Sequence, residues 1–277
     1  MKAAILAGAG NLPTLAAESL KKQGVETIAI TSAQNIKDNI EPLVSKVFLI
    51  GIGKVGKMLK ILKKEGITHL LMIGKFDKTI LEGGLRPDLT AIWYLLRLRN
   101  RNNDTIHYTV VDILKKRGIE TMSQSEVLKD IVPEVGVFTK NKPDKSQLAD
   151  IAFGYTVASE LGRLDVGQTV VVKKKSVMAV ESAEGTDKTI ARGCQLAKEN
   201  AVVVKAAKPS QDPRFDLPVV GMDSFKAVVE NKGKVLAVEA GKTLIVGLED
   251  CVKYANDNNI VFMAFKSEDF YDKSLFE

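Results

Sequence analysis

Acidic and basic side chains gather between Glu181 and Gly221, where residues of these types could do chemistry together. The set comprises Glu181, Glu184, Asp187, Lys205, Lys208, Asp212, Arg214 and Asp216. An apolar run over residues 201–204 predicts a buried strand among them, and the prolines that follow predict an irregular loop. Loops that a rigid scaffold holds in place often carry catalytic residues. This stretch is therefore the first candidate for an active site.

Carboxylates beside cations suit a phosphorylated substrate and a metal ion. A hard divalent cation typically contacts one or two carboxylates plus substrate phosphates, and the acids that could serve are Glu184, Asp187, Asp212 and Asp216. The cations that could neutralise phosphate charge are Lys205, Lys208 and Arg214. A metal-activated water attacking phosphorus would use this set. A structural ion-pair network explains the same residues about as well, and Asp187 also fits a helix cap.

The opening of the chain predicts a second phosphate site. A strand over residues 2–7, a helix over 14–23 and a strand over 25–31 form a β-turn-α-β unit. Its first turn, Gly8-Ala9-Gly10, would let backbone N–H groups approach a phosphate at the helix N-terminus. Pro13 replaces the last glycine of GxGxxG and no acid ends the second strand, so a dinucleotide is disfavoured. A phosphate or uridine-type ligand and a turn without a ligand both stay open.

Lys75 follows a strand predicted over residues 68–73, in the turn Gly74-Lys75-Phe76. In open α/β sheets, ligands bind at the carboxyl ends of the strands. Lys75 is thus a candidate substrate-binding residue, although taken alone it is better explained as a solvated loop lysine.

Composition and charge narrow the class of protein. The chain has 277 residues, 45% of them hydrophobic and 27% charged, which is typical of a soluble globular protein of one or two domains. A net charge of +6 favours an anionic partner, but no RNA-binding signature or helix-turn-helix accompanies it, so nucleic acid is not expected. Cys194 and Cys251 lack metal or disulfide spacing and indicate a reducing cytoplasm. Only His69 and His107 could supply histidine chemistry, and His69 is expected to be structural.

Residues 91–102, AIWYLLRLRNRN, mix aromatic and leucine side chains with arginines. A basic helix of this kind could lie on an anionic membrane or line an apolar channel. A core helix with an arginine-flanked edge fits equally well.

A Pro/Gly/Lys-rich bridge over residues 133–144 predicts a domain boundary. The fold class expected is α/β with two α/β domains, the first Rossmann-like and covering residues 1–135, the second covering residues 144–268. The second contains a predicted hairpin with a basic tip, residues 169–180, followed by the acidic turn that opens at Glu181.

Five motifs spread over nearly the whole chain carry a family resemblance. They are Leu6-Ala7-Gly8-x-Gly10-x-Leu12-Pro13, Gly51-Ile52-Gly53-Lys54, Gly162-Arg163-Leu164-Asp165-Val166-Gly167-Gln168, Ala179-Val180-Glu181-x-x-Glu184-Gly185-Thr186-Asp187, and Lys205-x-x-Lys208-Pro209-x-Gln211 leading to Arg214-x-Asp216-Leu217-Pro218. With these motifs the chain resembles the LpxI family of UDP-2,3-diacylglucosamine pyrophosphatases, from the lipid A pathway of Gram-negative bacteria. Two departures are Ala9, where the family usually has glycine, and Asp212, where relatives carry glutamate.

The resemblance implies a fold and a reaction. It implies two α/β domains around an interdomain ligand cleft, an N-terminal UDP/phosphate-binding domain and a C-terminal catalytic domain. It implies hydrolysis of UDP-2,3-diacylglucosamine to UMP and 2,3-diacylglucosamine 1-phosphate (lipid X) by Mg²⁺-assisted water attack on the α-phosphorus. The expected location is the cytoplasm, peripherally on the anionic inner membrane; a homodimer stays open.

The resemblance also assigns roles to residues. The family's critical aspartate maps onto Asp216. From their residue types, Asp187 and Glu184 are expected to assist it, and Asp216 and Asp212 are candidate Mg²⁺ ligands. Substrate binding is expected at Gly8, Ala9, Gly10, Asn11, Leu12, Lys75, Gln168, Thr186, Lys205, Lys208 and Arg214. The alternative from another class is a non-catalytic nucleotide- or lipid-binding protein that uses the same cleft.

Overall fold

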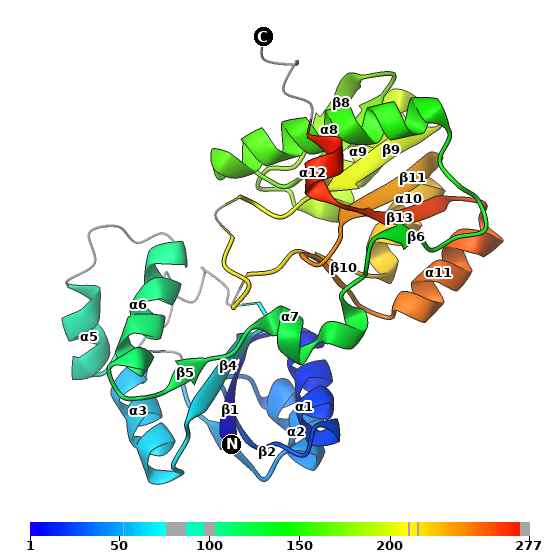
Figure 1. The fold of residues 1–277 in the computed structure, drawn as a ribbon. Helices are drawn as coiled ribbons and strands as arrows, with labels where there is room; N and C mark the ends of the chain where they lie inside the picture. Colours follow the sequence, from blue (N-terminus) through cyan, green and yellow to red (C-terminus); the bar gives the residue numbers. More distant parts are fainter. Residues whose placement is uncertain (52, 76–86, 97–102, 210, 215, 272–277) are drawn as a thin grey trace. The chain divides into compact units, whose positions relative to one another are not determined.

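The computed structural model describes residues 1–51, 53–75, 87–96, 103–209, 211–214 and 216–271 (Figure 1). The chain divides into two compact units. Unit 1 consists of Met1–Leu128 together with Pro213–Asp216, and unit 2 of Lys129–Asp212 together with Leu217–Glu277. No helix in the described ranges is both long enough and apolar enough to cross a membrane.

Unit 1 is built on a parallel sheet of five strands in the order β3-β2-β1-β4-β5. The strands are β1 (Lys2–Ala7), β2 (Glu26–Thr31), β3 (Lys46–Leu49), β4 (His69–Ile73) and β5 (Glu120–Thr121). The chain runs outward from β1 to β3 and then returns to place β4 on the other side of β1. The switch point of this Rossmann-like sheet therefore lies between β1 and β4, where such sheets bind their ligands.

Helices cover both faces of this sheet. They are α1 (Leu12–Lys22), α2 (Gln34–Ile40), α3 (Val55–Lys64), α5 (Leu89–Leu95), α6 (Asn103–Lys115) and α7 (Gln124–Val127), with a 3₁₀ turn at Glu41–Leu43. α3 and α6 bury Leu62 and Leu114 against Ala4, Ile28 and Leu70 of the sheet. α1 and α2 lie on the opposite face (Figure 1). Successive residues of a strand point to opposite faces of the sheet. Because helices cover both faces, both sets of side chains are apolar, and the strands are nearly continuous apolar runs in the sequence.

Unit 2 has a mixed sheet in the order β6-β13-β11-β9-β7-β8. Its strands are β6 (Gly136–Val137), β7 (Thr169–Lys173), β8 (Ser176–Val180), β9 (Ala201–Lys205), β11 (Gly233–Glu239) and β13 (Val261–Phe265). β9, β11 and β13 are parallel, β7 is antiparallel to both of its neighbours, and β6 is antiparallel to β13. A small parallel pair, β10 (Val219–Val220) with β12 (Leu244–Ile245), stands apart.

Two apolar layers sandwich this second sheet. Its helices are α8 (Lys145–Arg163), α9 (Thr186–Ala197), α10 (Met222–Glu230), α11 (Leu248–Asp257) and α12 (Ser267–Phe270), with a 3₁₀ turn at Lys129–Ile131. One layer centres on Phe225 and Phe262 and joins α9, α10 and α11. The other centres on Tyr155 and Phe265 and joins α8. The predicted basic hairpin is β7–β8, and the buried Asp150 accepts the N–H groups of Lys174 and Lys175 at its tip.

The chain passes from unit 1 to unit 2 between Leu128 and Lys129, a few residues before the bridge over residues 133–144. The bridge belongs to unit 2, because β6 pairs with β13 and Asp144 caps α8 through a capping box with Gln147. These contacts are hydrogen bonds of backbone and polar side-chain atoms, which the Pro/Gly/Lys-rich composition of the bridge does not reveal. Pro213–Asp216 groups with unit 1, although the residues before and after it in the sequence belong to unit 2.

Candidate active site

The two glycine turns predicted for ligand binding meet at the switch point of unit 1. The N–H of Gly8 donates to the carbonyl of Ile73 at 2.8 Å, and Ala9 and Lys75 exchange two backbone hydrogen bonds of 2.8 Å. A Cβ on Gly8 would lie 2.7 Å from the carbonyl oxygen of Lys75, so only glycine allows this approach. The structure thus brings Lys75 beside the turn that precedes α1.

The donors left at this turn are not those of its first two residues. The N–H groups of Gly8 and Ala9 are used by the turn after β4. Across the described residues, the N–H groups of Gly10, Asn11 and Leu12 have no acceptor, and Asn11 does not cap α1 with its side chain. Gly10 adopts φ +98°, a conformation that favours glycine. An anion at this helix N-terminus would therefore meet residues 10–12.

Residues 213–216, which carry the predicted catalytic aspartate, attach to the same end of the sheet in unit 1. The N–H of Gln124 donates to the carbonyl of Pro213 at 2.9 Å. Gln124 is only 4% exposed, and its Nε2 donates to the carbonyl of Met72 in β4 at 2.8 Å. β4 leads directly into the turn at Lys75. Gln124 therefore ties the segment to the strand that ends at this turn, a role that the sequence analysis missed.

The acids and cations around this segment differ in exposure. Asp212 and Arg214 are half-buried, whereas Asp216 is exposed. Leu217 and Pro218 are buried, and the carbonyl of Pro218 accepts a 2.8 Å hydrogen bond from the N–H of Leu244 in unit 2. Asp216 is thus exposed, while Leu217 and Pro218 after it are buried.

A second group of polar side chains lies at one edge of the sheet in unit 2. Lys205 ends β9 and is 4% exposed, and its Nζ donates to Oγ1 of Thr186 at 2.7 Å. The hydroxyl of Thr186 donates in turn to Oε1 of Glu181 at 2.8 Å. We call Lys205, Thr186 and Glu181 the relay. Because its proton goes to Glu181, the Thr186 hydroxyl cannot also donate to a substrate.

Two buried oxygen atoms, one in the relay and one in Gln168, lack hydrogen-bond donors in the part of the chain that the structure describes. Among the described residues, Oε2 of Glu181 and Oε1 of Gln168 are buried and have no hydrogen-bond partner. Buried oxygens of this kind normally find a donor, a water or a cation. Thr169 stands opposite Lys205 in the sheet and its carbonyl accepts from the N–H of Glu181, so Gln168 and Glu181 lie at the same edge. Glu181 is a candidate that the sequence analysis noted but did not assign.

The motif over residues 162–168 places this edge and the following loop. A Cβ on Gly167 would lie 2.1 Å from the carbonyl oxygen of Glu181, and one on Gly162 would lie 3.2 Å from Cα of Lys208. Nζ of Lys208 pairs with Oδ1 of Asp165 at 2.5 Å, and the carbonyl of Gln168 accepts from the N–H of Ala206. The motif is thus a scaffold for the loop after β9.

Glu184 and Asp187, the predicted assistants, each have a partner within unit 2. Oε1 of Glu184 lies 2.6 Å from Nη2 of Arg192. A hydrogen bond from its own backbone, and then Arg192, hold the pKa of the Glu184 carboxyl below its usual range. Oδ1 of Asp187 accepts a 2.7 Å hydrogen bond from the hydroxyl of Ser224 in α10. Their proposed catalytic roles stay predictions.

Glu239 is a further buried acid at this edge. It ends β11, is 1% exposed, and accepts from the N–H of Ala207 at 2.9 Å through Oε2. Its Oε1 pairs with Nζ of Lys242 at 2.8 Å. That contact raises the pKa of Lys242. Glu239 thereby fixes the first residues of the loop after Lys205, and a lone acid at the end of an apolar run was its signal in the sequence.

The cysteines and the other metal-ligating side chains are weaker candidates for catalysis. Burial raises the pKa of the thiols of Cys194 and Cys251 to about 11, so neither is a nucleophile at neutral pH. Within the described ranges, no group of three or more His, Cys, Asp or Glu side chains could hold a metal ion.

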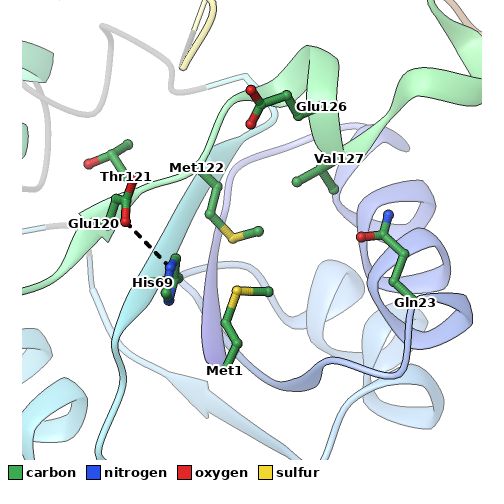
Figure 2. A pocket seen from close by; sticks show the side chains of 8 residues that line it. All are labelled: Met1, Gln23, His69, Glu120, Thr121, Met122, Glu126 and Val127. Carbon is green, nitrogen blue, oxygen red and sulfur yellow. Dashed lines mark ion pairs between the residues drawn. The ribbon is translucent and has the colours of Figure 1, made fainter.

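The cavity in Figure 2 lies away from these groups. It has a volume of about 280 Å³ and lies beside the amino-terminal ends of β1 and β4. Its lining residues are Met1, Gln23, His69, Glu120, Thr121, Met122, Glu126 and Val127. His69 forms an ion pair with Glu120 there, with 3.5 Å between Nε2 and Oε2, and Thr68 bonds its Nδ1. His69 is thus held by Glu120 of the neighbouring strand β5 and by the adjacent Thr68, contacts that suit a structural histidine.

These features define a class of protein. It is a two-unit α/β protein whose polar groups gather at the carboxyl ends of parallel strands, as in proteins that bind phosphorylated ligands. The LpxI N-terminal domain matches residues 2–131 and the LpxI C-terminal domain matches residues 134–263. The chain belongs to the LpxI family, which confirms the resemblance seen in its motifs.

A named relative agrees with this assignment. The chain is 30% identical over 269 residues to UDP-2,3-diacylglucosamine pyrophosphatase LpxI of Caulobacter vibrioides, with 92% of this chain and 94% of the relative covered.

Likeness to solved structures is weak. UDP-glucose-4-epimerase from Stenotrophomonas maltophila gives a TM-score of 0.30 at 13% identity over 43% of this chain. Glycinamide-RNase-transformylase T from Mycobacterium tuberculosis gives 0.28 at 10% identity over 66%. The chain spans 34% and 44% of these two proteins, and neither likeness bears on function.

Proposed function

We propose that this protein hydrolyses the pyrophosphate of UDP-2,3-diacylglucosamine to UMP and 2,3-diacylglucosamine 1-phosphate. Membership of the LpxI family along nearly the whole chain supports the reaction, as does the activity in the name of the Caulobacter relative. Water would attack the α-phosphorus. The bond from this phosphorus to the bridging oxygen breaks, and that oxygen leaves with the sugar phosphate.

One observation supports the assignment of this reaction to particular residues of the chain. The segment that bears Asp216 groups with unit 1, where Gln124 links it to β4 beside the Gly8–Gly10 turn. An exposed carboxylate in a segment held at the switch point of a parallel sheet suits a reaction on a phosphorylated ligand. A freely moving surface aspartate would offer no such positioning.

The remaining roles in binding and catalysis are assigned to hydrogen-bonding groups and charged side chains. We assign the diphosphate to the N–H groups of residues 10–12 and to the exposed ammonium of Lys75. Asp216 would accept a hydrogen bond from the attacking water and so orient it. Lys205 would bring the positive charge of its ammonium to the substrate while the relay fixes its position. Lys208 and Arg214 would add positive charge near the phosphates.

We propose Asp212 and Asp216 as the residues that would bind Mg²⁺, because their carboxylate oxygens are of the type that Mg²⁺ prefers. Mg²⁺ is usually bound through one or two carboxylates plus substrate phosphates rather than by an all-protein cage, and the described residues form no such cage. When bound, Mg²⁺ would neutralise charge on the diphosphate oxygens. Metal dependence is part of the proposal.

The test is UMP release from UDP-2,3-diacylglucosamine by an Asp216→Asn variant. We expect the variant to fold and to lose at least about a hundredfold in kcat, because orienting and deprotonating groups contribute about that much or more. Asp130→Asn, at another exposed aspartate, is the matched control and should retain activity.

Near-normal turnover by Asp216→Asn would remove Asp216 from the mechanism. Tight binding of the substrate by the wild type without UMP release would instead favour a non-catalytic binding protein.

The substrate's acyl chains place the reaction at a lipid surface. We propose that the protein works from the cytoplasm, associated peripherally with an anionic inner membrane, and its net charge of +6 supports this association.

A further inference from the structure

Large apolar side chains of α5 (Leu89–Leu95) and of its C-cap residue Leu96 are exposed to solvent. Leu89, Ile92, Trp93 and Leu96 are 86%, 40%, 48% and 77% exposed. Their spacing of three and four residues places them on one face of the helix. Ala91, in contrast, is 4% exposed, and Tyr94 packs against the core of unit 1. An outward stripe of large apolar side chains is the reverse of the usual pattern for a surface helix.

Hydrogen bonds and a close approach hold the N-terminal end of α5 against α3. Asp88 caps α5 by accepting the N–H of Ala91 at 2.9 Å through Oδ1. Its Oδ2 accepts the N–H groups of Gly56 and Lys57 in α3, at 2.7 and 3.3 Å. A Cβ on Gly56 would lie 2.7 Å from Oγ1 of Thr90, so the two helices approach closely. α5 is therefore docked on α3 with its apolar side outward.

The helix on which α5 docks is rich in lysine. α3 carries exposed lysines at positions 57, 60, 63 and 64, and the backbone N–H of Lys57 donates to the carboxylate of Asp88 that caps α5. In the sequence, Arg97, Arg99 and Arg101 follow the helix. An apolar stripe beside lysines, with a tryptophan among the apolar residues, is the composition of a surface that lies in the interface of an anionic bilayer.

We infer that the stripe of α5 and the lysines of α3 form the membrane-docking face of this protein. Leu89, Ile92, Trp93 and Leu96 enter the interfacial layer, and the lysines contact anionic headgroups. The inference rests on the proposed function for the identity of the membrane, since the substrate's acyl chains reside there, but not for the residues that make the face.

Trp93 makes the inference directly measurable, because it is the single tryptophan of the chain. We would use the full chain as Asp216→Asn, which isolates binding from turnover. Vesicles of equal parts phosphatidylethanolamine and phosphatidylglycerol, with and without brominated acyl chains, supply the bilayer. We expect a blue shift of Trp93 emission on binding and quenching by the brominated chains. Vesicle binding without either signal would overturn the inference.

Matched variants test the two parts of the face by vesicle flotation. Leu89→Ser with Leu96→Ser should weaken binding by at least about tenfold, from the lost burial of leucine side chains. Leu196→Ser, at a leucine 60% exposed in unit 2, should leave binding unchanged. Lys57→Gln with Lys60→Gln should weaken binding about thirtyfold, at roughly fivefold for each lysine. Lys226→Gln with Lys253→Gln, exposed in unit 2, is the charge control. Equal losses in variants and controls would overturn the inference.

Other occupants of the face give different results. If brominated substrate in detergent quenches Trp93 and brominated vesicles do not, the face holds acyl chains of the substrate and the inference fails. If Trp93 emission changes with protein concentration without vesicles, a second copy covers the face and the inference also fails. Hydrolysis by the wild type of detergent-dispersed substrate is scored separately, so docking can fail while the proposed reaction stands, and the reverse.

Discussion

Replacing Thr186 with valine tests the relay that positions Lys205. The substitution keeps the shape of the side chain and removes the hydroxyl that accepts from Lys205 Nζ at 2.7 Å and donates to Glu181 Oε1 at 2.8 Å. Hydrogen bonds to charged groups are worth about 1.5–3 kcal/mol each. Water cannot readily replace the lost partner at Lys205, which is 4% exposed. We therefore expect the free energy of unfolding of unit 2 to fall by about 3 kcal/mol.

Hydrogen exchange measured by mass spectrometry locates this loss. Amides of β9 and of the first turns of α9 should exchange about a hundredfold faster in Thr186→Val, which is the factor that 3 kcal/mol implies. Thr186→Ser keeps the hydroxyl and should restore most of the protection. UMP release should fall in Thr186→Val and recover in Thr186→Ser, because Lys205 then regains its orientation.

Thr243→Val is the matched control for this experiment. Thr243 is fully buried in unit 2, and its hydroxyl has no hydrogen-bond partner in the described part of the chain. Removing an unsatisfied hydroxyl should be neutral or stabilising. If Thr186→Val costs no more stability than Thr243→Val, the relay is not an energetic unit and the reasoning is wrong.

Two further predictions follow from contacts around the same edge. Gly167→Ala places a Cβ 2.1 Å from the carbonyl of Glu181 and should destabilise the protein by at least about 1–3 kcal/mol in urea unfolding, whereas Gly136→Ala, where a Cβ meets open space, should not. Arg192→Gln tests pH dependence: the lowered pKa of Glu184 gives stability above its ordinary value of 4.5 that is lost as the pH falls through the lowered pKa. The gap in urea midpoint between wild type and Arg192→Gln should therefore close only below pH 4.5, and a gap that closes nearer neutrality would contradict this assignment.

The sequence predicted the elements of unit 1 where periodicity and glycines agreed. The predicted first strand is β1 (Lys2–Ala7), and the predicted first helix, after the glycine turn, is α1 (Leu12–Lys22). α2 (Gln34–Ile40) was missed, because a seven-residue helix with only Ile36 and Ile40 buried has too short an apolar pattern to recognise.

The place of residues 213–216 could not have been predicted from local sequence. The link to unit 1 is a hydrogen bond from a backbone N–H, that of Gln124, to a backbone carbonyl, that of Pro213. Neither group depends on residue type, so no motif marks it. The pairing of Ala9 with Lys75 is of the same kind: two turns were predicted separately, and backbone hydrogen bonds join them.

Gly162, Asp165 and Gly167 show how residues of a family motif can act by holding other residues in place. At Gly162 and Gly167, backbone atoms of Lys208 and Glu181 occupy the space that a side chain would need, and glycine leaves room for them. Asp165 adopts φ +56° and pairs with Lys208. Each of these residues fixes another residue that the proposed mechanism uses or that supports Lys205. Substitutions in this motif should therefore impair activity by displacing Lys208 and Glu181. Their defects should accordingly appear together with a loss of stability, whereas Asp216→Asn should impair turnover with stability retained.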